Sequence, residues 1–298
     1  MTSLLLLPVP GNEDIAQRIA ALAGGEVGQL ETRSFPDGEQ YVRVLSNVEQ
    51  REAVIVCTLR RPNESFLPLA FLADALHDLG APSVGLVAPY LAYMRQDARF
   101  SSGEAVTSRS FADLISSRVD WLVTVDPHLH RLTALSDVYS IPAIATHAAE
   151  DLGRWIAANV ELPFIIGPDA ESAQWVNDIA RAADAPSTLL TKVRRGDADV
   201  IESIPDLAGN RHRSPVLVDD IISTGRTMLT AITHLTEQGA RPASCVAVHA
   251  VFASDAYVAL RDAGAARIAT TNTIPHPSNA IDVTRLIANH IRTLVAAD

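Results

Sequence analysis

The chain alternates between short apolar runs and longer segments in which apolar residues recur every three or four positions. The runs are rich in Val, Ile and Leu, which is typical of strands buried in a parallel sheet. The periodic segments place their apolar residues on one face, which predicts helices. The expected strands span residues 4–9, 27–35, 41–45, 53–59, 83–89, 121–125, 164–166, 187–193, 216–218 and 245–252. The expected helices span residues 15–22, 67–79, 111–115, 148–158, 173–182 and 228–235, with a closing helix from 283.

This order of elements predicts an α/β protein with two doubly wound domains, each built on a central parallel sheet. We expect the domains to join within residues 141–148, so that they span 1–143 and 144–298. Each half contains an apolar strand that ends in an acid, at Asp126 and at Asp219, which hints at an internal duplication. Acids are also common at strand ends wherever ligands bind at the carboxyl edge of a parallel sheet.

Composition narrows the class of protein. With 298 residues, 48% of them hydrophobic and 20% charged, the chain has the make-up of a globular protein with two cores. No apolar run approaches a membrane span, and the first residues lack a secretory signal, so we expect a cytoplasmic protein without membrane contact. The net charge of −11 argues against nucleic acid as a partner. Cys57 and Cys245 lie in separate apolar runs, which favours buried thiols over a disulfide.

The most informative stretch is residues 215–227, Pro-Val-Leu-Val-Asp-Asp-Ile-Ile-Ser-Thr-Gly-Arg-Thr. A strand leads into two carboxylates, and a small hydroxylated loop leads into a helix. The N–H groups of a helix N-terminus favour phosphate, whereas paired carboxylates suit vicinal sugar hydroxyls, so the stretch predicts a ribose 5-phosphate site. The alternative is a strand-end Asp that only caps a turn. The residues expected to bind the sugar phosphate are Asp219, Asp220, Ser223, Thr224, Gly225 and Thr227.

The stretch resembles the PRPP loop of the type I phosphoribosyltransferase fold, and further segments resemble the phosphoribosyl pyrophosphate (PRPP) synthetases, or ribose-phosphate pyrophosphokinases. These segments are Ser-Phe-Pro-Asp-Gly-Glu (34–39), Pro-Tyr-Leu-Ala-Tyr-Met-Arg-Gln-Asp (89–97), Gly-Glu-Ala-Val-Thr-Ser (103–108), Thr-Val-Asp-Pro-His (124–128), Gly-Pro-Asp (167–169), Thr-Lys-Val-Arg (191–194) and Thr-Asn-Thr-Ile-Pro (271–275). They occur in the order of the family. The Gly-Glu-Ala insertion and the form of the loop look more like the archaeal-type (class III) branch.

The resemblance implies transfer of the β,γ-diphosphoryl group of ATP to the 1-hydroxyl of ribose 5-phosphate, with Mg²⁺, giving PRPP and AMP. Catalysis of this kind is mainly in-line positioning and neutralisation of charge on phosphate oxygens. By resemblance, Lys192 and Arg194 clamp the transferred group, and His128 and Asp169 contact Mg²⁺ or its waters. A dimer-based homo-oligomer is also implied, because in the family the nucleotide site lies at a dimer contact. The residues implied for ATP are Arg95 and Gln96, with Phe35, Asp37 and Glu39 from a neighbouring subunit.

Three positions depart from the family pattern. Ala98 stands where a base is common, Glu171 stands where small residues are usual, and Arg226 replaces a second Gly. A carboxylate at 171 repels phosphate unless it points away or binds metal, and Arg226 adds a Cβ at a position that could require a positive φ. Two alternatives therefore stay open. One is a non-catalytic regulatory paralogue of a synthetase, and the other is a nucleobase phosphoribosyltransferase, which has no reason to keep Arg95 and His128.

Overall fold

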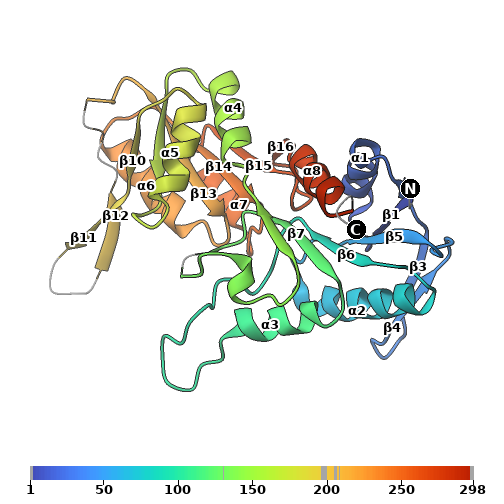
Figure 1. The fold of residues 1–298 in the computed structure, drawn as a ribbon. Helices are drawn as coiled ribbons and strands as arrows, with labels where there is room; N and C mark the ends of the chain where they lie inside the picture. The colour runs from blue at the N-terminus through green and yellow to red at the C-terminus, as the bar shows by residue number, and fades with distance from the viewer. Residues whose placement is uncertain (1–2, 130, 196–199, 205–206, 208, 296–298) are drawn as a thin grey trace. The chain divides into compact units, whose positions relative to one another are not determined.

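The computed structural model describes residues 3–129, 131–195, 200–204, 207 and 209–295, with the backbone alone for 191–195 and 200–204. The chain divides into two compact units (Figure 1). Unit 1 comprises the residues up to 147, together with 273–275 and those from 283 onward, and unit 2 comprises 148–272 and 276–282. None of the described helices combines the length and apolar character that a membrane span requires.

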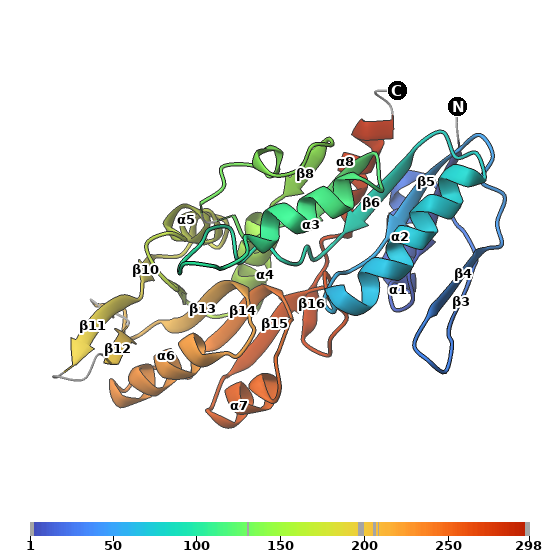
Figure 2. The same cartoon turned by 90° about the horizontal axis from the view of Figure 1, so that it is seen from below.

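In its described part, unit 1 is built on a six-stranded parallel sheet in the order β2-β1-β5-β6-β7-β8. The strands are β1 (Ser3–Pro8), β2 (Glu26–Val27), β5 (Arg51–Val56), β6 (Val84–Ala88), β7 (Trp121–Val125) and β8 (Ala143–Thr146). The other elements are α1 (Glu13–Ala23), α2 (Pro62–Asp78), α3 (Thr107–Ser116), the 3₁₀ turn η1 (Leu135–Asp137), α8 (Thr284–Val295), and the antiparallel hairpin β3 (Leu30–Ser34) and β4 (Gln40–Val44). Helices α1 and α8 cover one face of the sheet, and α2 and α3 cover the other (Figures 1 and 2).

Unit 2 has a second sheet of the same kind, with six described parallel strands in the order β10-β9-β13-β14-β15-β16. The strands are β9 (Pro163–Gly167), β10 (Ser187–Leu189), β13 (Ser214–Ile221), β14 (Ser244–His249), β15 (Arg267–Thr271) and β16 (Asn279–Ile281). The other elements are α4 (Ala149–Asn159), α5 (Ala173–Ala182), α6 (Arg226–Glu237), α7 (Ala256–Asp262), and the antiparallel hairpin β11 (Thr191–Arg195) and β12 (Val200–Ile204). Two doubly wound units with parallel sheets confirm the predicted fold class.

The two sheets have the same topology, which gives the hint of duplication a structural basis. Numbered along the chain, the sheet strands of each unit lie in the order 2-1-3-4-5-6, and each unit carries an antiparallel hairpin after its second sheet strand. The pair of acids that gave the hint does not correspond, however. Asp126 follows β7, the fifth sheet strand of unit 1, whereas Asp219 lies on β13, the third of unit 2. The two units are therefore repeats of one topology, but the two strands that end in an acid do not occupy equivalent positions in them.

Each unit contains one helix that directly follows a sheet strand of the other unit in the sequence. Helix α4 follows β8 of unit 1 but packs on α5, and α8 follows β16 of unit 2 but packs on α1. The buried stripe of α8 includes Ile287 and Ile291, and that of α1 includes Ile15 and Ile19. The boundary predicted at 143/144 gives α8 to the second domain, whereas its contacts group it with unit 1. The spacing of apolar residues reveals a buried face but not the element that covers it.

Buried strands account for most of the agreement with the predicted pattern. Every residue of β6 and β7 is buried, as their uninterrupted apolar runs predict. Gly85 of β6 is required by packing, since a Cβ there would lie 2.1 Å from the indole ring of Trp121.

The thiols of Cys57 and Cys245 are free and buried, and burial raises the pKa of each to about 12.

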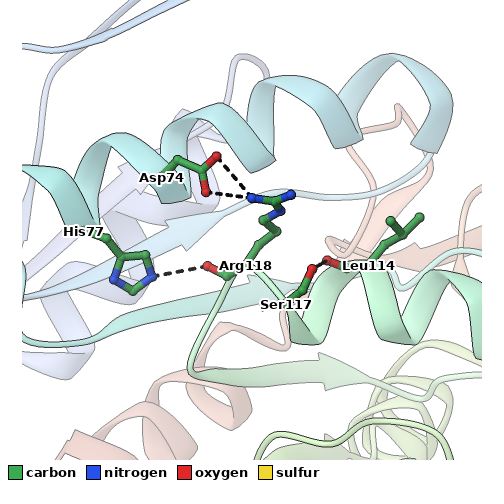
Figure 3. A network of polar contacts seen from close by, with 5 residues as sticks. All are labelled: Asp74, His77, Leu114, Ser117 and Arg118. Carbon is green, nitrogen blue, oxygen red and sulfur yellow. Dashed lines mark hydrogen bonds and ion pairs between the residues drawn. The ribbon is translucent and has the colours of Figure 1, made fainter.

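Helices α2 and α3 are joined by a small polar network at the C-terminal end of α3 (Figure 3). Nη1 of Arg118 donates to both carboxylate oxygens of Asp74, at 3.1 and 3.2 Å, and Nε2 of His77 lies 3.3 Å from the carbonyl oxygen of Arg118. Because these groups are exposed, the ion pair contributes at most about 1 kcal/mol. The Ser117 hydroxyl donates to the carbonyl of Leu114 at 2.8 Å, and the Leu114 side chain is 47% exposed.

The predicted pattern also missed some elements. The strand expected over residues 187–193 is two strands, because the N–H of Leu190 donates to the carbonyl of Gly167 and the chain then leaves the sheet to form β11. Elements β8, β12, α7, β15 and β16 were not predicted. Most of them are short, with three to five residues in each of these strands and seven in α7, so too few positions define a period.

Candidate functional site

In unit 2, three carboxylates lie at the point where the direction of winding reverses. Strands β9 and β13 are neighbours, and the helices that follow them cover opposite faces of the sheet, which is the position at which α/β sheets bind ligands beyond the carboxyl ends of their strands. Asp169 lies two residues beyond β9, and Asp219 and Asp220 lie near the end of β13. The strand does not stop at these acids but continues to Ile221, with Asp219 opposite Ala247 of β14. Sheet hydrogen bonds therefore hold the acids in place.

These three carboxylates lie close enough to one another to interact electrostatically. Burial raises the pKa of Asp219 well above its usual value of 3.8, and repulsion from Asp220 and Asp169 raises it further, against a hydrogen bond from the N–H of Asp220 that lowers it. That N–H donates to Oδ1 of Asp219 at 3.0 Å. Groups that bring cations or hydroxyl donors would relieve this repulsion, so this carboxylate site suits a polyol, a divalent cation, or both.

The loop after β13 presents a helix N-terminus beside the carboxylates. Gly225 caps α6 with a φ of 69°, and its carbonyl accepts the N–H of Leu229 at 2.8 Å. No described side chain caps this helix. Ser223, Thr224 and Thr227 lie on the same turn at or near the surface. The first N–H groups of α6, together with these hydroxyls, form a site that favours an anion such as phosphate.

The structure removes one concern about the departures in this loop. Arg226 is the first residue of α6, and the positive φ of the turn belongs to Gly225. A Cβ at 226 therefore causes no backbone strain. Glu171, another of the three departures, is exposed, and its N–H donates to Oδ1 of Asp169 at 3.1 Å, as does the N–H of Ser172 at 3.2 Å. These bonds fix the carboxylate of Asp169 and make position 171 part of its support.

In unit 1, the candidate residues gather on the loops that follow β6 and β7, which are neighbouring strands. Arg95 and Gln96 lie on the first loop, and the carbonyl of Gln96 accepts the N–H of Ser108 at 3.3 Å. His128 lies on the second. Its loop starts at Asp126, which has a φ of 34° and whose buried carboxylate lies 2.9 Å from Nδ1 of His147. Both loops leave the carboxyl edge of the sheet, as ligand-binding loops do.

Asp97 joins these two loops, and sequence reasoning gave it no role. Its side chain is 2% exposed, and it accepts the backbone N–H of Arg131 at 3.1 Å and Nη1 of the same residue at 3.0 Å. The guanidinium of Arg131 also lies 4.9 Å from the ring centre of Phe100. Asp97 belongs to a quoted motif, but Arg131 lies outside every motif, so only the structure reveals the pair.

Phe35, Asp37 and Glu39 lie on the turn of the β3–β4 hairpin and are exposed. The N–H of Phe35 donates to the carbonyl of Glu39 at 2.8 Å, which closes the turn. The guanidinium of Arg33 lies 4.7 Å from the ring centre of Phe35 and 4.5 Å from that of Tyr41. This cation–π contact holds an aromatic ring at the surface, where its remaining area is available to a planar ligand.

In unit 1, hydrogen bonds within the chain cross the position that corresponds to the carboxylate site of unit 2. Oδ1 of buried Asn12, after β1, accepts the N–H of Thr58, after β5, at 2.8 Å. The hydroxyl of Thr58 donates to the carbonyl of Thr273 at 2.7 Å. The two repeats thus differ in where their candidate site residues lie. In unit 2 they lie beyond β9 and β13, and in unit 1 they lie on the loops after β6 and β7.

The remaining predicted residues are placed only in part. Lys192 and Arg194 lie on β11, opposite Ser203 and Ile201 of β12, and their side chains lie outside the described part of the structure. His128 belongs to unit 1 and Asp169 to unit 2. Among the described residues, no group of three or more His, Cys, Asp or Glu has the geometry of a metal site. Mg²⁺ commonly takes one or two carboxylates and completes its shell with water and substrate phosphates, so an open arrangement is compatible with it.

Comparisons with known proteins cover both units. Residues 4–118 match the N-terminal domain of ribose phosphate pyrophosphokinase, and residues 134–293 match the phosphoribosyl transferase domain. The chain is 34% identical to ribose-phosphate pyrophosphokinase 2 of Archaeoglobus fulgidus, over 96% of this chain and 99% of that one. It is 32% identical to the ribose-phosphate pyrophosphokinase of Methanobrevibacter smithii, over 94% and 97%. The crystal structure of phosphoribosylpyrophosphate synthetase from Mycobacterium smegmatis shares the fold over the whole of both chains, with a TM-score of 0.87 at 24% identity.

Proposed function

Because the chain belongs to the ribose-phosphate pyrophosphokinase family, we propose that it transfers the β,γ-diphosphoryl group of ATP to ribose 5-phosphate, giving PRPP and AMP. One structural observation supports the proposal independently of family membership. Unit 2 places three carboxylates beside the N-terminus of α6, which no described side chain caps, and burial together with repulsion from the other two carboxylates raises the pKa of Asp219. A sugar that carries a phosphate complements both features at once, since its hydroxyls can donate to carboxylates and its phosphate can accept from N–H groups.

Ribose 5-phosphate then binds with its phosphate on Ser223, Thr224, Gly225 and Thr227 and with its ring hydroxyls toward Asp219 and Asp220. Gly225 supports this arrangement because its positive φ turns successive N–H groups toward one point. The 1-hydroxyl is the nucleophile: its oxygen bonds to the β-phosphorus of ATP, the bond from that phosphorus to the α,β-bridging oxygen breaks, AMP leaves with that oxygen, and the hydroxyl proton is released to water. The described residues hold the sugar in line for that attack, which is the main contribution a protein makes to phosphoryl transfer.

ATP binds through Arg95 and Gln96 of one subunit and Phe35, Asp37 and Glu39 of its neighbour. The hairpin supports this role, since it presents the Phe35 ring at the surface with one side held by Arg33. A planar adenine can stack on such a ring, and Asp37 and Glu39 supply acceptors for its amino group. Activity then depends on a homo-oligomer built from dimers.

The family generally uses Mg²⁺, and the residues of this chain fit it. Asp169 holds its Oδ1 in two backbone hydrogen bonds and keeps Oδ2 outside them, and the neighbouring carboxylates repel one another in the way that a cation relieves. We assign Asp169 and His128 to the ion or its waters, where Mg²⁺ supplies neutralisation of phosphate charge. Lys192 and Arg194 complete that neutralisation on the transferred group, which is strongest in the transition state.

The two alternatives make different predictions. A nucleobase phosphoribosyltransferase does not explain the match of residues 4–118 to the N-terminal domain of the pyrophosphokinases. A regulatory paralogue remains the second candidate because of Glu171 and Arg226, but the structure shows the first exposed and the second in an unstrained helical turn. Cytoplasmic location stays a prediction from the sequence.

The deciding experiment is detection of AMP and PRPP from purified protein with ATP, Mg²⁺ and ribose 5-phosphate. Asp220→Asn should lose most of the product, whereas Thr233→Ser, on the exposed side of α6, should retain it. Mixing Phe35→Ala subunits with Lys192→Ala subunits should restore part of the activity, because each change damages a different half of a shared site. Absence of product from the unmodified protein would favour the paralogue, and failure of exchanging subunits to complement would place the nucleotide site within one chain.

A further inference from the structure

The segment after β14 carries two non-glycine residues in the left-handed region of the backbone. Phe252 has a φ of 33° and Ser254 has a φ of 55°. Residues with a side chain rarely adopt such angles, and a bulky aromatic residue least of all. Conformations of this kind persist only where the surroundings hold them, and they gather at functional sites. Its contacts with the neighbouring loop and with the side chains that pack on it should therefore account for this conformation.

The segment after β14 is hydrogen-bonded to the start of the proposed sugar-phosphate loop, by which we mean residues 223–227. The N–H of Phe252 donates to the carbonyl of Ile222 at 2.8 Å, and the N–H of Ala253 donates to the carbonyl of Ser223 at 3.0 Å. The N–H of Ile222 in turn donates to the carbonyl of His249 at 3.1 Å. These bonds fix the backbone immediately before Thr224 and Gly225. A change in the position of Phe252 would thus move the start of the loop.

Two rings hold Phe252 in this conformation. Its side chain is 6% exposed, and its ring centre lies 4.6 Å from that of His276 and 5.3 Å from that of Tyr257 on α7. The His276 and Tyr257 rings are themselves 4.8 Å apart, with an interplanar angle of 74°. Edge-to-face and tilted contacts at these distances are favourable, and each ring restricts the rotamers of the other two.

His276 is the member of the cluster that hydrogen bonds orient. Its Nδ1 accepts the N–H of Ser278 at 3.1 Å and lies 2.7 Å from the hydroxyl of that residue, which is 4% exposed. The Ser278 hydroxyl lies 2.8 Å from that of Thr270 on β15, and the N–H of His276 donates to Oδ1 of Asn279 at 2.9 Å. Because Nδ1 accepts a backbone N–H, the neutral ring carries its proton on Nε2.

We propose that His276 is a positioning residue for the sugar-phosphate loop. Its imidazole, oriented by Ser278, packs on Phe252 and keeps that residue in the conformation that binds Ile222 and Ser223. The loop then offers its N–H groups in a fixed arrangement before the ligand arrives. That the ligand is ribose 5-phosphate rests on the function proposed above. The role of His276 in positioning the loop does not depend on that function.

Amide hydrogen exchange resolved by NMR tests the hold directly, through the N–H groups of Phe252 and Ala253. In His276→Ala we expect these two amides to exchange on the order of tenfold faster, because the ring that holds them is lost. His276→Phe, which keeps a ring, should restore part of the protection. His212→Ala, at an exposed histidine of the same unit, should leave both amides unchanged.

Kinetics on the same proteins test the consequence for the ligand. His276→Ala should raise KM for ribose 5-phosphate about tenfold and leave KM for ATP within about twofold, since only the sugar loop is displaced. Unchanged exchange at Phe252 and Ala253 in a folded His276→Ala protein would overturn the proposal. If that variant does not fold, Tyr257→Leu removes another ring of the cluster and must give the same pattern. Failure of the unmodified protein to bind ribose 5-phosphate would overturn the proposed function instead, and exchange would still decide the role of His276.

Discussion

Loss of the contact between Asp97 and Arg131 should destabilise unit 1 and weaken the binding of ATP. Arg131→Ala leaves the Asp97 carboxylate, 2% exposed, with the backbone N–H of residue 131 as its remaining donor among the described contacts. The lost charge-assisted hydrogen bond is worth about 1.5–3 kcal/mol. The contact of the guanidinium with Phe100 adds about 0.5–1 kcal/mol. Because the Arg131 side chain is 53% exposed, the cost should stay below the upper figure of about 5 kcal/mol for breaking a fully buried pair. We therefore expect a loss of about 2–4 kcal/mol in the free energy of unfolding.

Urea denaturation of a double-mutant cycle measures this loss. The cycle compares the unmodified protein, Asp97→Ala, Arg131→Ala and the double variant. Trp121 of unit 1 serves as the fluorescent reporter once Trp155 and Trp175 of unit 2 are replaced by Phe. The coupling energy should be about 1–3 kcal/mol, as for contacting residues in one network. Arg131→Lys keeps the charge but not the planar group over Phe100, so it should recover only part of the stability.

The same cycle has a kinetic consequence. Asp97 directly follows Arg95 and Gln96, so Arg131→Ala should raise KM for ATP more than KM for ribose 5-phosphate. A coupling energy below about 0.5 kcal/mol would refute the structural reasoning, because it would mean that water replaces Arg131 at the carboxylate without cost. A large coupling with no change in KM for ATP would keep the pair as a structural contact and separate it from the nucleotide site.

Two further outcomes follow from the carboxylates and from the glycine of the sugar-phosphate loop. Because the pKa of Asp219 is higher in the folded protein than its usual 3.8, its charge destabilises the fold above the raised value and not below 3.8. Asp219→Asn should therefore melt at a higher temperature than the unmodified protein above neutral pH, without ligand, and the gain should vanish as the pH falls toward 3.8; an equal gain at all pH values would contradict this. Gly225→Ala and Gly239→Ala place a Cβ at φ values of 69° and 71°, each at a cost of about 1–2 kcal/mol. Only Gly225→Ala should also raise KM for ribose 5-phosphate, and an equal rise in both variants would show that the loop has no special role.

The sequence carried most of the information on the α/β layers and on the residues at their edges. Runs such as those of β6 and β7 are easy to recognise because strands buried on both faces are almost entirely apolar, with Thr124 the one polar residue in these two strands. Asp219 and Gly225 were recognisable because their chemistry follows directly from neighbours in sequence. Elements of a few residues, such as β16, were missed because they contain too few positions for a period to show.

Contacts between residues far apart in sequence lay beyond that reasoning. The partner of Asp97 is Arg131, and the ring that packs on Phe252 belongs to His276. Nothing local to either residue indicates its partner, since the contact arises only when the sheet brings separate loops to one edge. The two left-handed residues of the segment after β14 were equally hidden, because neither Phe nor Ser signals a positive φ. Long-range contacts thus decide how a recognisable site is held.

The packing of α8 on α1 also bears on how the protein is made. The chain emerges from the ribosome in order, so the side of α1 that packs on α8 stays uncovered until α8 has been made. About 135 residues separate the end of the first stretch of unit 1 from α8, and at about 5–20 residues per second their synthesis takes roughly 7–27 s. During that time the first sheet lacks one of its covering helices, whereas α5 of unit 2 meets an α4 that has already been made. Nascent chains that stop before residue 284 should therefore be held by chaperones through the apolar face of α1.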